Sequence, residues 1–254
     1  MSGLRTLVAA NASPMTLDGT RTYVIGHQRV AIIDPGPSLQ EHQDAVADAV
    51  GDGVAVCILL THAHPDHAEG ADALAARLRT NVLAGTTRTL HDRNVIQTDA
   101  GAITALATPG HTADHFSFWW QPERAVFCGD LLMGGMDTAL VARPEGDLAQ
   151  YLASLRALQA LDARVIYPAH GAPFHDAAAA IERYVQHREQ RVQQVIEGLQ
   201  DGPLFADALL EQVYGPELDR RMRQYAETAV EAYLEYLRDQ KRVRESSSGV
   251  WSLL

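Results

Sequence analysis

The feature that most constrains the fold is an unbroken apolar run from Val54 to Leu60 that leads directly into the polar segment from Thr61 to His67. In the run, apolar residues do not alternate with polar ones as they do in a strand with one solvent-exposed face. It therefore predicts a strand buried on both faces. Such strands belong to layered folds of sheets and helices, where functional side chains often follow the carboxyl ends of strands. The polar segment is therefore predicted to lie at a functional edge of a sheet.

The order of the other expected elements indicates a mixed α+β fold. Short strands separated by turn-forming residues open the chain, and later strands alternate with helices. The expected strands are residues 6–10, 21–25, 30–33, 54–60, 81–84, 102–107, 116–120, 124–128 and 164–167. The expected helices are residues 39–50, residues 68–78 and one that begins after Asp147 as N-cap.

The pattern changes at about residue 177, where helices replace strands. Helices are expected over residues 177–200 and 204–214 and up to about 239, followed by a hairpin within 241–253. We therefore expect a catalytic domain of residues 1–177 and a small winged-helix-like domain of residues 178–254. The second region holds ten Lys and Arg against thirteen Asp and Glu, despite a basic cluster at Arg220, Arg221 and Arg223. This balance favours packing, dimerisation or a wall of the substrate cleft over DNA reading.

Composition narrows the partners and the compartment. The formal net charge of -11 repels polyanions, which disfavours sequence-independent nucleic-acid binding. Cys57 and Cys128 lie inside apolar runs, where a cysteine usually behaves as a small buried hydrophobe, so no disulfide is expected. No secretion signal or membrane span is recognised, and a cytoplasmic protein is expected.

The segment after the buried strand is rich in metal-ligating side chains. His62 and His64 are two residues apart, so on an extended backbone they project to the same side. Asp66 and His67 turn away and could serve a second ion. Imidazole nitrogens and carboxylate oxygens are the ligands that hold zinc and similar divalent ions.

Three later positions repeat the pattern of a strand end followed by a metal-ligating side chain. They are His111 in Thr-Pro-Gly-His-Thr, Asp130 in Cys-Gly-Asp and His170 in Pro-Ala-His-Gly. Together with the four residues of the first segment they form a set of seven candidate ligands.

These motifs resemble those of the metallo-β-lactamase superfamily in order, character and spacing over about residues 1–177, with no departure at a ligand position. The C-terminal region resembles the winged-helix extension of the beta-lactamase-like protein 2 group, through segment order and the closing Gly249-Val250-Trp251. The resemblance implies an αββα sandwich with the site at one edge of its two sheets.

The resemblance also implies the division of the ligands. His62, His64 and His111 would bind one metal, Asp66, His67 and His170 the other, and Asp130 would bridge them. Two Zn²⁺ ions are expected, with iron or manganese as alternatives. A hydroxide shared by the two metals would attack the substrate, and Asp66, the expected catalytic residue, would orient it or handle its proton.

The leading functional hypothesis is a glyoxalase-II-like hydrolase of a small ester or thioester. The first alternative is a single-strand endoribonuclease, which would make single-stranded RNA the partner. β-Lactam hydrolysis ranks lower because most such lactamases lack an aspartate at the position of Asp130. Iron-dependent sulfur oxygenation or oxygen reduction is a further alternative, although the di-iron reductases usually have glutamate where this chain has His64. Substrate and oligomeric state stay open.

Two residues near these motifs have competing interpretations. His115 is interpreted as a structural hydrogen-bonding residue in preference to a support for the ligands or a substrate contact. Asp34 would either hold the ligand loop through hydrogen bonds or cap a turn, and the sequence does not separate these roles.

Overall fold

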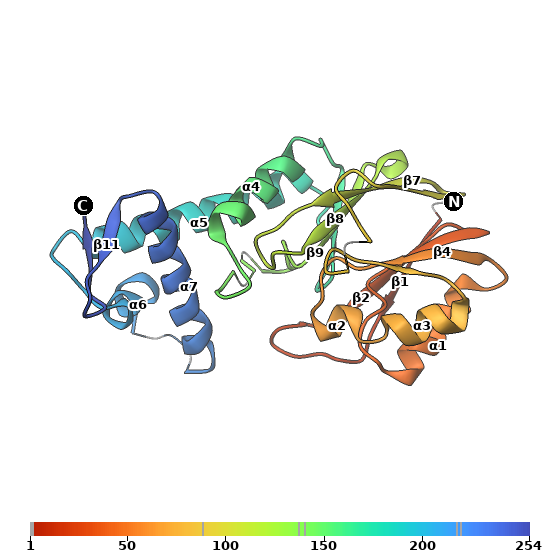
Figure 1. Ribbon diagram of the computed structural model, residues 1–254, viewed down its shortest axis with the longest axis horizontal. Coiled ribbons are helices and arrows are strands. Elements are labelled where there is room, and N and C mark those ends of the chain that lie inside the picture. The colour runs from red at the N-terminus through yellow and green to blue at the C-terminus, as the bar shows by residue number, and fades with distance from the viewer. Residues whose placement is uncertain (1–2, 88, 137, 140, 217, 219) are drawn as a thin grey trace.

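The computed structural model describes residues 3–87, 89–136, 138–139, 141–216, 218 and 220–254. Two five-stranded sheets lie face to face, and helices cover the outer face of each sheet (Figure 1). The chain therefore has the mixed α+β architecture that the sequence predicts, in the order helix, sheet, sheet, helix.

The first sheet has the strand order β1-β2-β3-β4-β5. Its strands are β1 (Leu4–Val8), β2 (Arg21–Ile25), β3 (Arg29–Ile33), β4 (Val54–Leu59) and β5 (Val82–Leu83). Strands β1 to β3 pair antiparallel, whereas β3, β4 and β5 run parallel. Helices α1 (Gln40–Val50) and α3 (Ala71–Leu78) cover the outer face, where Val46 and Leu74 share an apolar cluster with Ile58 of β4.

The second sheet has the strand order β10-β9-β8-β7-β6. Its strands are β6 (Val95–Thr98), β7 (Gly101–Ala107), β8 (Phe116–Trp120), β9 (Ala125–Gly129) and β10 (Val165–Pro168). A 3-10 turn, η1 (Gln121–Glu123), joins β8 to β9. Helix α4 (Leu148–Gln159) begins at Asp147, whose carboxylate accepts a hydrogen bond from Gln150 N at 2.9 Å, as an N-cap does.

Strand β4 has buried residues on both faces, as its composition predicts; Val54 is exposed and Val56 is half-buried. Cys57 and Leu59 belong to the core between the two sheets, whereas Ala55 and Ile58 lie under the helices. The strand is thus fixed from both sides, and the segment that follows it starts from a rigid position.

Two local expectations are corrected by the structure. The single helix expected over residues 68–78 is two helices, α2 (Pro65–Ala68) and α3, which are separated at Gly70. A side chain at residue 70 would meet the Gln43 amide, since an added Cβ would lie 2.1 Å from Gln43 Nε2.

Strand β6 was not expected. It alternates exposed and buried residues, and it pairs with β7 across a tight turn.

The C-terminal region is helical with a terminal hairpin, as predicted. It contains α5 (Ala177–Gly198), α6 (Ala206–Tyr214), α7 (Arg220–Asp239), β11 (Val243–Glu245) and β12 (Trp251–Leu253), at the left of Figure 1. One apolar cluster runs through Leu155 of α4, Ile181 of α5 and Leu234 of α7. The helices after residue 177 therefore share a core with the outer face of the second sheet. The domain boundary at 177/178 and the winged-helix-like character stay predictions.

Both cysteines are buried and free, as expected. None of the helices in the described parts of the chain has the length and apolar character that a membrane span requires.

The shared core predicts a large effect of truncating its centre. Replacing the fully buried Leu155 with Ala removes apolar contacts from both α4 and the C-terminal helices, so the free energy of unfolding should fall by about 2–5 kcal/mol. Urea denaturation followed by circular dichroism measures the change. The same substitution at Leu39, which is 39% exposed, is the control and should cost clearly less. Equal losses at the two positions would contradict the proposed importance of this core.

Candidate metal centre

All seven candidate ligands lie where strands of the two sheets end on the same side of the sandwich. His62 and His64 follow β4, and Asp66 and His67 lie in the short helix α2. His111 lies in the loop after β7, Asp130 directly follows β9 and His170 lies just beyond β10. Residues far apart in the sequence are therefore brought together because their strands end at one edge.

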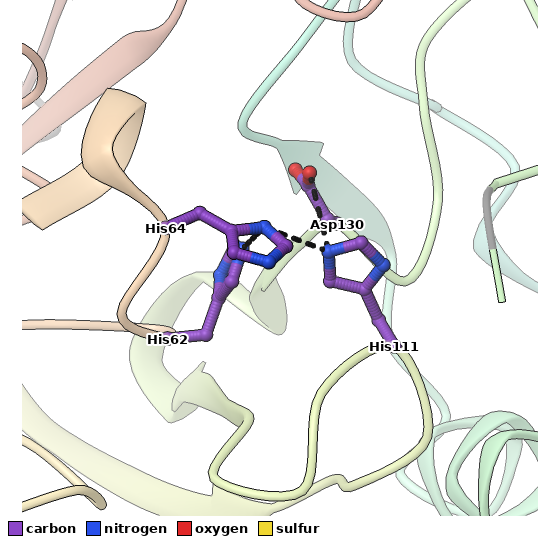
Figure 2. A group of neighbouring side chains, drawn as sticks. All are labelled: His62, His64, His111 and Asp130. Atoms are coloured by element: carbon purple, nitrogen blue, oxygen red, sulfur yellow. Dashed lines mark hydrogen bonds and ion pairs between the residues drawn. The ribbon is translucent and has the colours of Figure 1, made fainter. Parts of the chain in front are cut away.

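The first group consists of His62, His64, His111 and Asp130, and Figure 2 shows their side chains turned toward one another. His64 Nδ1 lies 2.9 Å from His62 Nε2 and 3.2 Å from His111 Nε2. Asp130 Oδ2 lies 3.7 Å from His111 Nε2. Three imidazole nitrogens and one carboxylate oxygen thus face a common point.

The second group consists of Asp66, His67 and His170. Asp66 Oδ2 lies 3.5 Å from His67 Nε2 and 3.3 Å from His170 Nε2. The other oxygen of Asp130, Oδ1, lies 3.4 Å from His67 Nε2 and 3.3 Å from His170 Nε2. Asp130 therefore turns one carboxylate oxygen toward each group.

A buried carboxylate holds the ligand segment from behind. Asp34 Oδ1 accepts a hydrogen bond from Thr61 N at 2.8 Å, and Oδ2 accepts from Thr61 Oγ1 at 2.7 Å and from His67 Nδ1 at 2.9 Å. Of the two interpretations of Asp34, the structure supports the one that holds the ligand loop. Thr61 was not singled out from the sequence, although its hydroxyl links Asp34 to His62 Nδ1 at 3.1 Å.

The outer hydrogen bonds assign the tautomers of three histidines. His67 Nδ1 faces Asp34 and His170 Nδ1 faces the Gly19 carbonyl at 3.4 Å, so each ring donates there and directs the lone pair of Nε2 into the site. His64 is reversed, because its Nε2 lies 2.8 Å from Glu145 Oε2. Its Nδ1 lone pair therefore faces the site. Glu145 has no local sequence signal, since it lies in a loop 81 residues after His64.

The site has the features of a cation site. If His62 Nδ1 donates to the Thr61 hydroxyl, the Nε2 lone pair of His62 is directed at the lone pair of His64 Nδ1, an arrangement that is favourable only with a proton or cation between them. His67 Nε2 and Asp130 Oδ1 are buried and have no hydrogen-bond partner. Neutral imidazole nitrogens and carboxylate oxygens that converge in this way fit zinc or a similar divalent ion.

The ionisation of the site follows from burial and mutual charge. Burial would raise the pKa of Asp130, but His67 and His170 hold it well below its usual range, so its carboxylate is charged at neutral pH. Burial lowers the pKa of His62 strongly. Burial also acts to lower the pKa of His170, but the adjacent carboxylates of Asp130 and Asp66 raise it to about 9. Carboxylates in this site thus favour positive charge at the imidazoles or between them.

The hydrogen bonds of His115 agree with the structural role that the sequence favours for it. Its Nδ1 bonds to Thr108 Oγ1 at 3.0 Å, and its Nε2 accepts from Asp130 N at 3.3 Å, so it fixes the backbone at Asp130. Gly129 packs against this ring. It has a φ of +51°, and an added Cβ would lie 2.7 Å from His115 Nε2. A glycine is therefore required before Asp130.

Comparison with known proteins connects this geometry with a family. A family model described as Metallo-beta-lactamase superfamily matches residues 15–96 and 86–170. The Beta-lactamase-like protein 2 homolog of Caenorhabditis elegans is 30% identical over 212 residues, which cover 77% of this chain and 70% of that protein. The Lactamase-like protein aptB of Emericella nidulans is 34% identical over 199 residues, 74% of this chain but only 63% of that protein.

A relative named for its reaction and a solved structure extend the comparison. The Atrochrysone carboxyl ACP thioesterase of Aspergillus terreus is 29% identical over 242 residues, 87% of this chain and 74% of that protein. The crystal structure of a metallo-beta-lactamase family protein from Thermus thermophilus has a TM-score of 0.81 and 21% identity, and the match covers 99% of both chains. This likeness extends the shared fold through the C-terminal helices.

The hydrogen bonds of Asp34 predict that its substitution weakens metal binding without removing a ligand. Asn has nearly the same size as Asp and also adopts positive φ, so Asp34→Asn preserves the backbone at the local φ of 48°. The variant lacks the carboxylate that accepts hydrogen bonds from Thr61 and His67. Zinc affinity, measured by competition with a chromophoric chelator, should fall about 10–100-fold.

The matched control is Asp99→Asn. Asp99 is likewise a hydrogen-bond acceptor, from His27 N and Gln28 N, both at 2.8 Å, but it holds a turn that contributes none of the seven candidate ligands. The control should bind zinc as the unmodified protein does. Unchanged zinc affinity in the Asp34→Asn variant would contradict the role of Asp34 in supporting the metal ligands.

Proposed function

Because this chain belongs to the metallo-beta-lactamase superfamily, we propose that it is a dinuclear-metal hydrolase, glyoxalase-II-like, that cleaves a thioester or a related small ester. The observation that carries the proposal is the convergence of two ligand groups on opposite oxygens of Asp130. A carboxylate shared in this way suits two adjacent cations.

The residues divide into two sets in this proposal. His62, His64 and His111 would hold one ion, Asp66, His67 and His170 would hold the other, and Asp130 would serve both. When bound, two divalent ions lower the pKa of a water molecule toward neutrality and polarise the carbonyl oxygen of the bond to be cleaved. Zinc is the proposed metal, with iron or manganese as alternatives.

Asp66 is proposed to handle the proton of the attacking water. Its side chain is 28% exposed, whereas those of His67 and His170 are almost completely buried, so the carboxylate reaches both the ligand group and the solvent side. Burial would raise the pKa of Asp66, but the adjacent imidazoles of His170 and His67 lower it overall. The group is therefore ionised at neutral pH and can accept a proton at its exposed edge.

The substrate side of the site is open at His64 and Asp66. The His64 side chain is 33% exposed, and Glu145 Oε2 holds its outer nitrogen at 2.8 Å. A carbonyl group approaching from this direction would meet the two groups of ligands together. The thioesterase among the relatives favours a thioester over the other ester substrates.

A hydrolysis panel tests the substrate class. The zinc-loaded protein is offered an acyl thioester, a lactone, a β-lactam and labelled single-stranded RNA, and we expect the thioester to be cleaved with the highest kcat/KM. His62→Ala removes a proposed ligand and should abolish this activity. Cleavage of RNA alone would overturn the proposal in favour of an endoribonuclease.

Substitution of Asp66 tests its part in the reaction. Asp66→Ala removes the proposed proton acceptor, so kcat should fall at least about 10²–10⁴-fold. Metal content, measured by atomic emission in the same samples, separates lost chemistry from a lost ion. Asp72→Ala, on the exposed side of α3, is the matched control and should keep full activity. An unaffected rate in the Asp66 variant would contradict the assigned role.

A further inference from the structure

A cavity of about 190 Å³ lies between the loop that follows Asp130 and the C-terminal helices α5 and α7. Its walls are mainly apolar, and methionines form a large share of them: Met15, Met133, Met136 and Met222. Methionine side chains adapt to apolar ligands of different shape. The proposed reaction assigns no role to this cavity.

One wall of the cavity is formed by the two segments that contact His170. Met133 lies three residues after Asp130, and the neighbouring Gly134 N donates to the His170 carbonyl at 2.8 Å. Met15 belongs to the strap that leads to Thr20, which pairs with His170 through an isolated bridge. The cavity therefore shares two backbone segments with the His170 side of the proposed metal centre.

The wall formed by α5 contains a buried guanidinium group. The Arg188 residue is only 3% exposed, and it donates to the Tyr233 hydroxyl at 2.8 Å and to the Ala139 carbonyl. It also lies 5.4 Å from the centre of the Tyr151 ring. These partners are neutral, and Arg188 Nε has no hydrogen-bond partner.

A buried cation with neutral partners is energetically costly. Within the described parts of the chain, Arg188 makes no ion pair with a carboxylate, and none of the described residues that line the cavity is Asp or Glu. A second guanidinium, that of Arg191, lines the same wall and lies 4.4 Å from the centre of the Tyr214 ring. The cavity thus combines mainly apolar walls with positive charge on its α5 wall.

We propose that this cavity binds the acyl part of the substrate, and that the acyl chain carries an anionic oxygen at its far end that pairs with Arg188. This inference rests on the proposed thioester hydrolysis. The apolar walls would contact the hydrocarbon portion, and the anionic group would supply the missing counter-charge. A polyphosphate fits poorly, because most of the lining could not hydrogen-bond to its oxygens.

Ligand binding tests the cavity without turnover. In chelator-treated protein, calorimetry compares octanoate with octanamide, which has the same chain but no charge. Octanoate should bind about tenfold more tightly or better, because a charge-assisted hydrogen bond to Arg188 is gained. Arg188→Met should remove this preference. Equal affinity of the two probes in the unmodified protein, or no binding of either, would overturn the inference.

A second variant blocks the cavity without altering the charge. Ala229 on α7 lines the cavity, and Ala229→Phe would fill part of it. Octanoate binding should then be lost, whereas Glu231→Phe, at an exposed position two residues later, should leave it unchanged. Thermal unfolding confirms that each variant is folded. Octanoate binding that survives in Ala229→Phe would place the ligand elsewhere and overturn the inference.

Kinetics separate this inference from the proposed function. N-acetylcysteamine thioesters of octanoic acid and of octanedioic acid differ only in the distal carboxylate, and the zinc-loaded protein should prefer the second about tenfold in kcat/KM. The preference should vanish in Arg188→Met. If octanoate binds selectively but no thioester is cleaved, the proposed reaction fails and the anion-binding cavity stands. If both thioesters are cleaved equally, the reaction stands and the role of Arg188 fails.

Discussion

The structure depends on holding charged and titratable side chains together at a largely buried edge of two sheets. Asp66 and Asp130 bring carboxylates into a group of five histidines, and taking such groups out of water is costly unless each is paired. The Asp34 carboxylate meets part of this requirement by accepting from Thr61 and His67. The remaining lone pairs point inward, an arrangement that suits a cation at this edge of the sheets.

Much of this site is predictable because it is built from strand ends. The buried strand before Thr61 and the short motifs at His111, Asp130 and His170 each carry a local signal, and parallel strands bring such signals to one edge. The seven side chains that the structure gathers are therefore the seven that the sequence singles out. Their roles as ligands stay a prediction until a metal is measured.

The parts that the sequence did not predict depend on contacts between distant segments. Between α2 and α3, Gly70 packs against the Gln43 side chain of α1, and its N–H donates to the Gly36 carbonyl at 3.0 Å. Periodicity within residues 68–78 contains no sign of either contact. Glu145 reaches His64 from a loop 81 residues away, without a motif of its own. Local sequence patterns also do not predict the apolar cluster shared by α4, α5 and α7, although they predict the helices themselves.

This shared cluster changes how the C-terminal region relates to catalysis. Tyr184 of α5 donates to the Met133 carbonyl and accepts from Met133 N, both at 2.8 Å, so the turn after Asp130 is held by a helix beyond residue 177. The same turn forms a wall of the cavity that contains Arg188. The C-terminal helices thus support the loop next to the proposed metal centre and shape the proposed acyl cavity, while they contribute none of the seven candidate ligands. If the cavity binds the acyl part of the substrate as proposed, substitutions in these helices alter substrate choice without altering the ligand set, as happens when one fold serves different substrates.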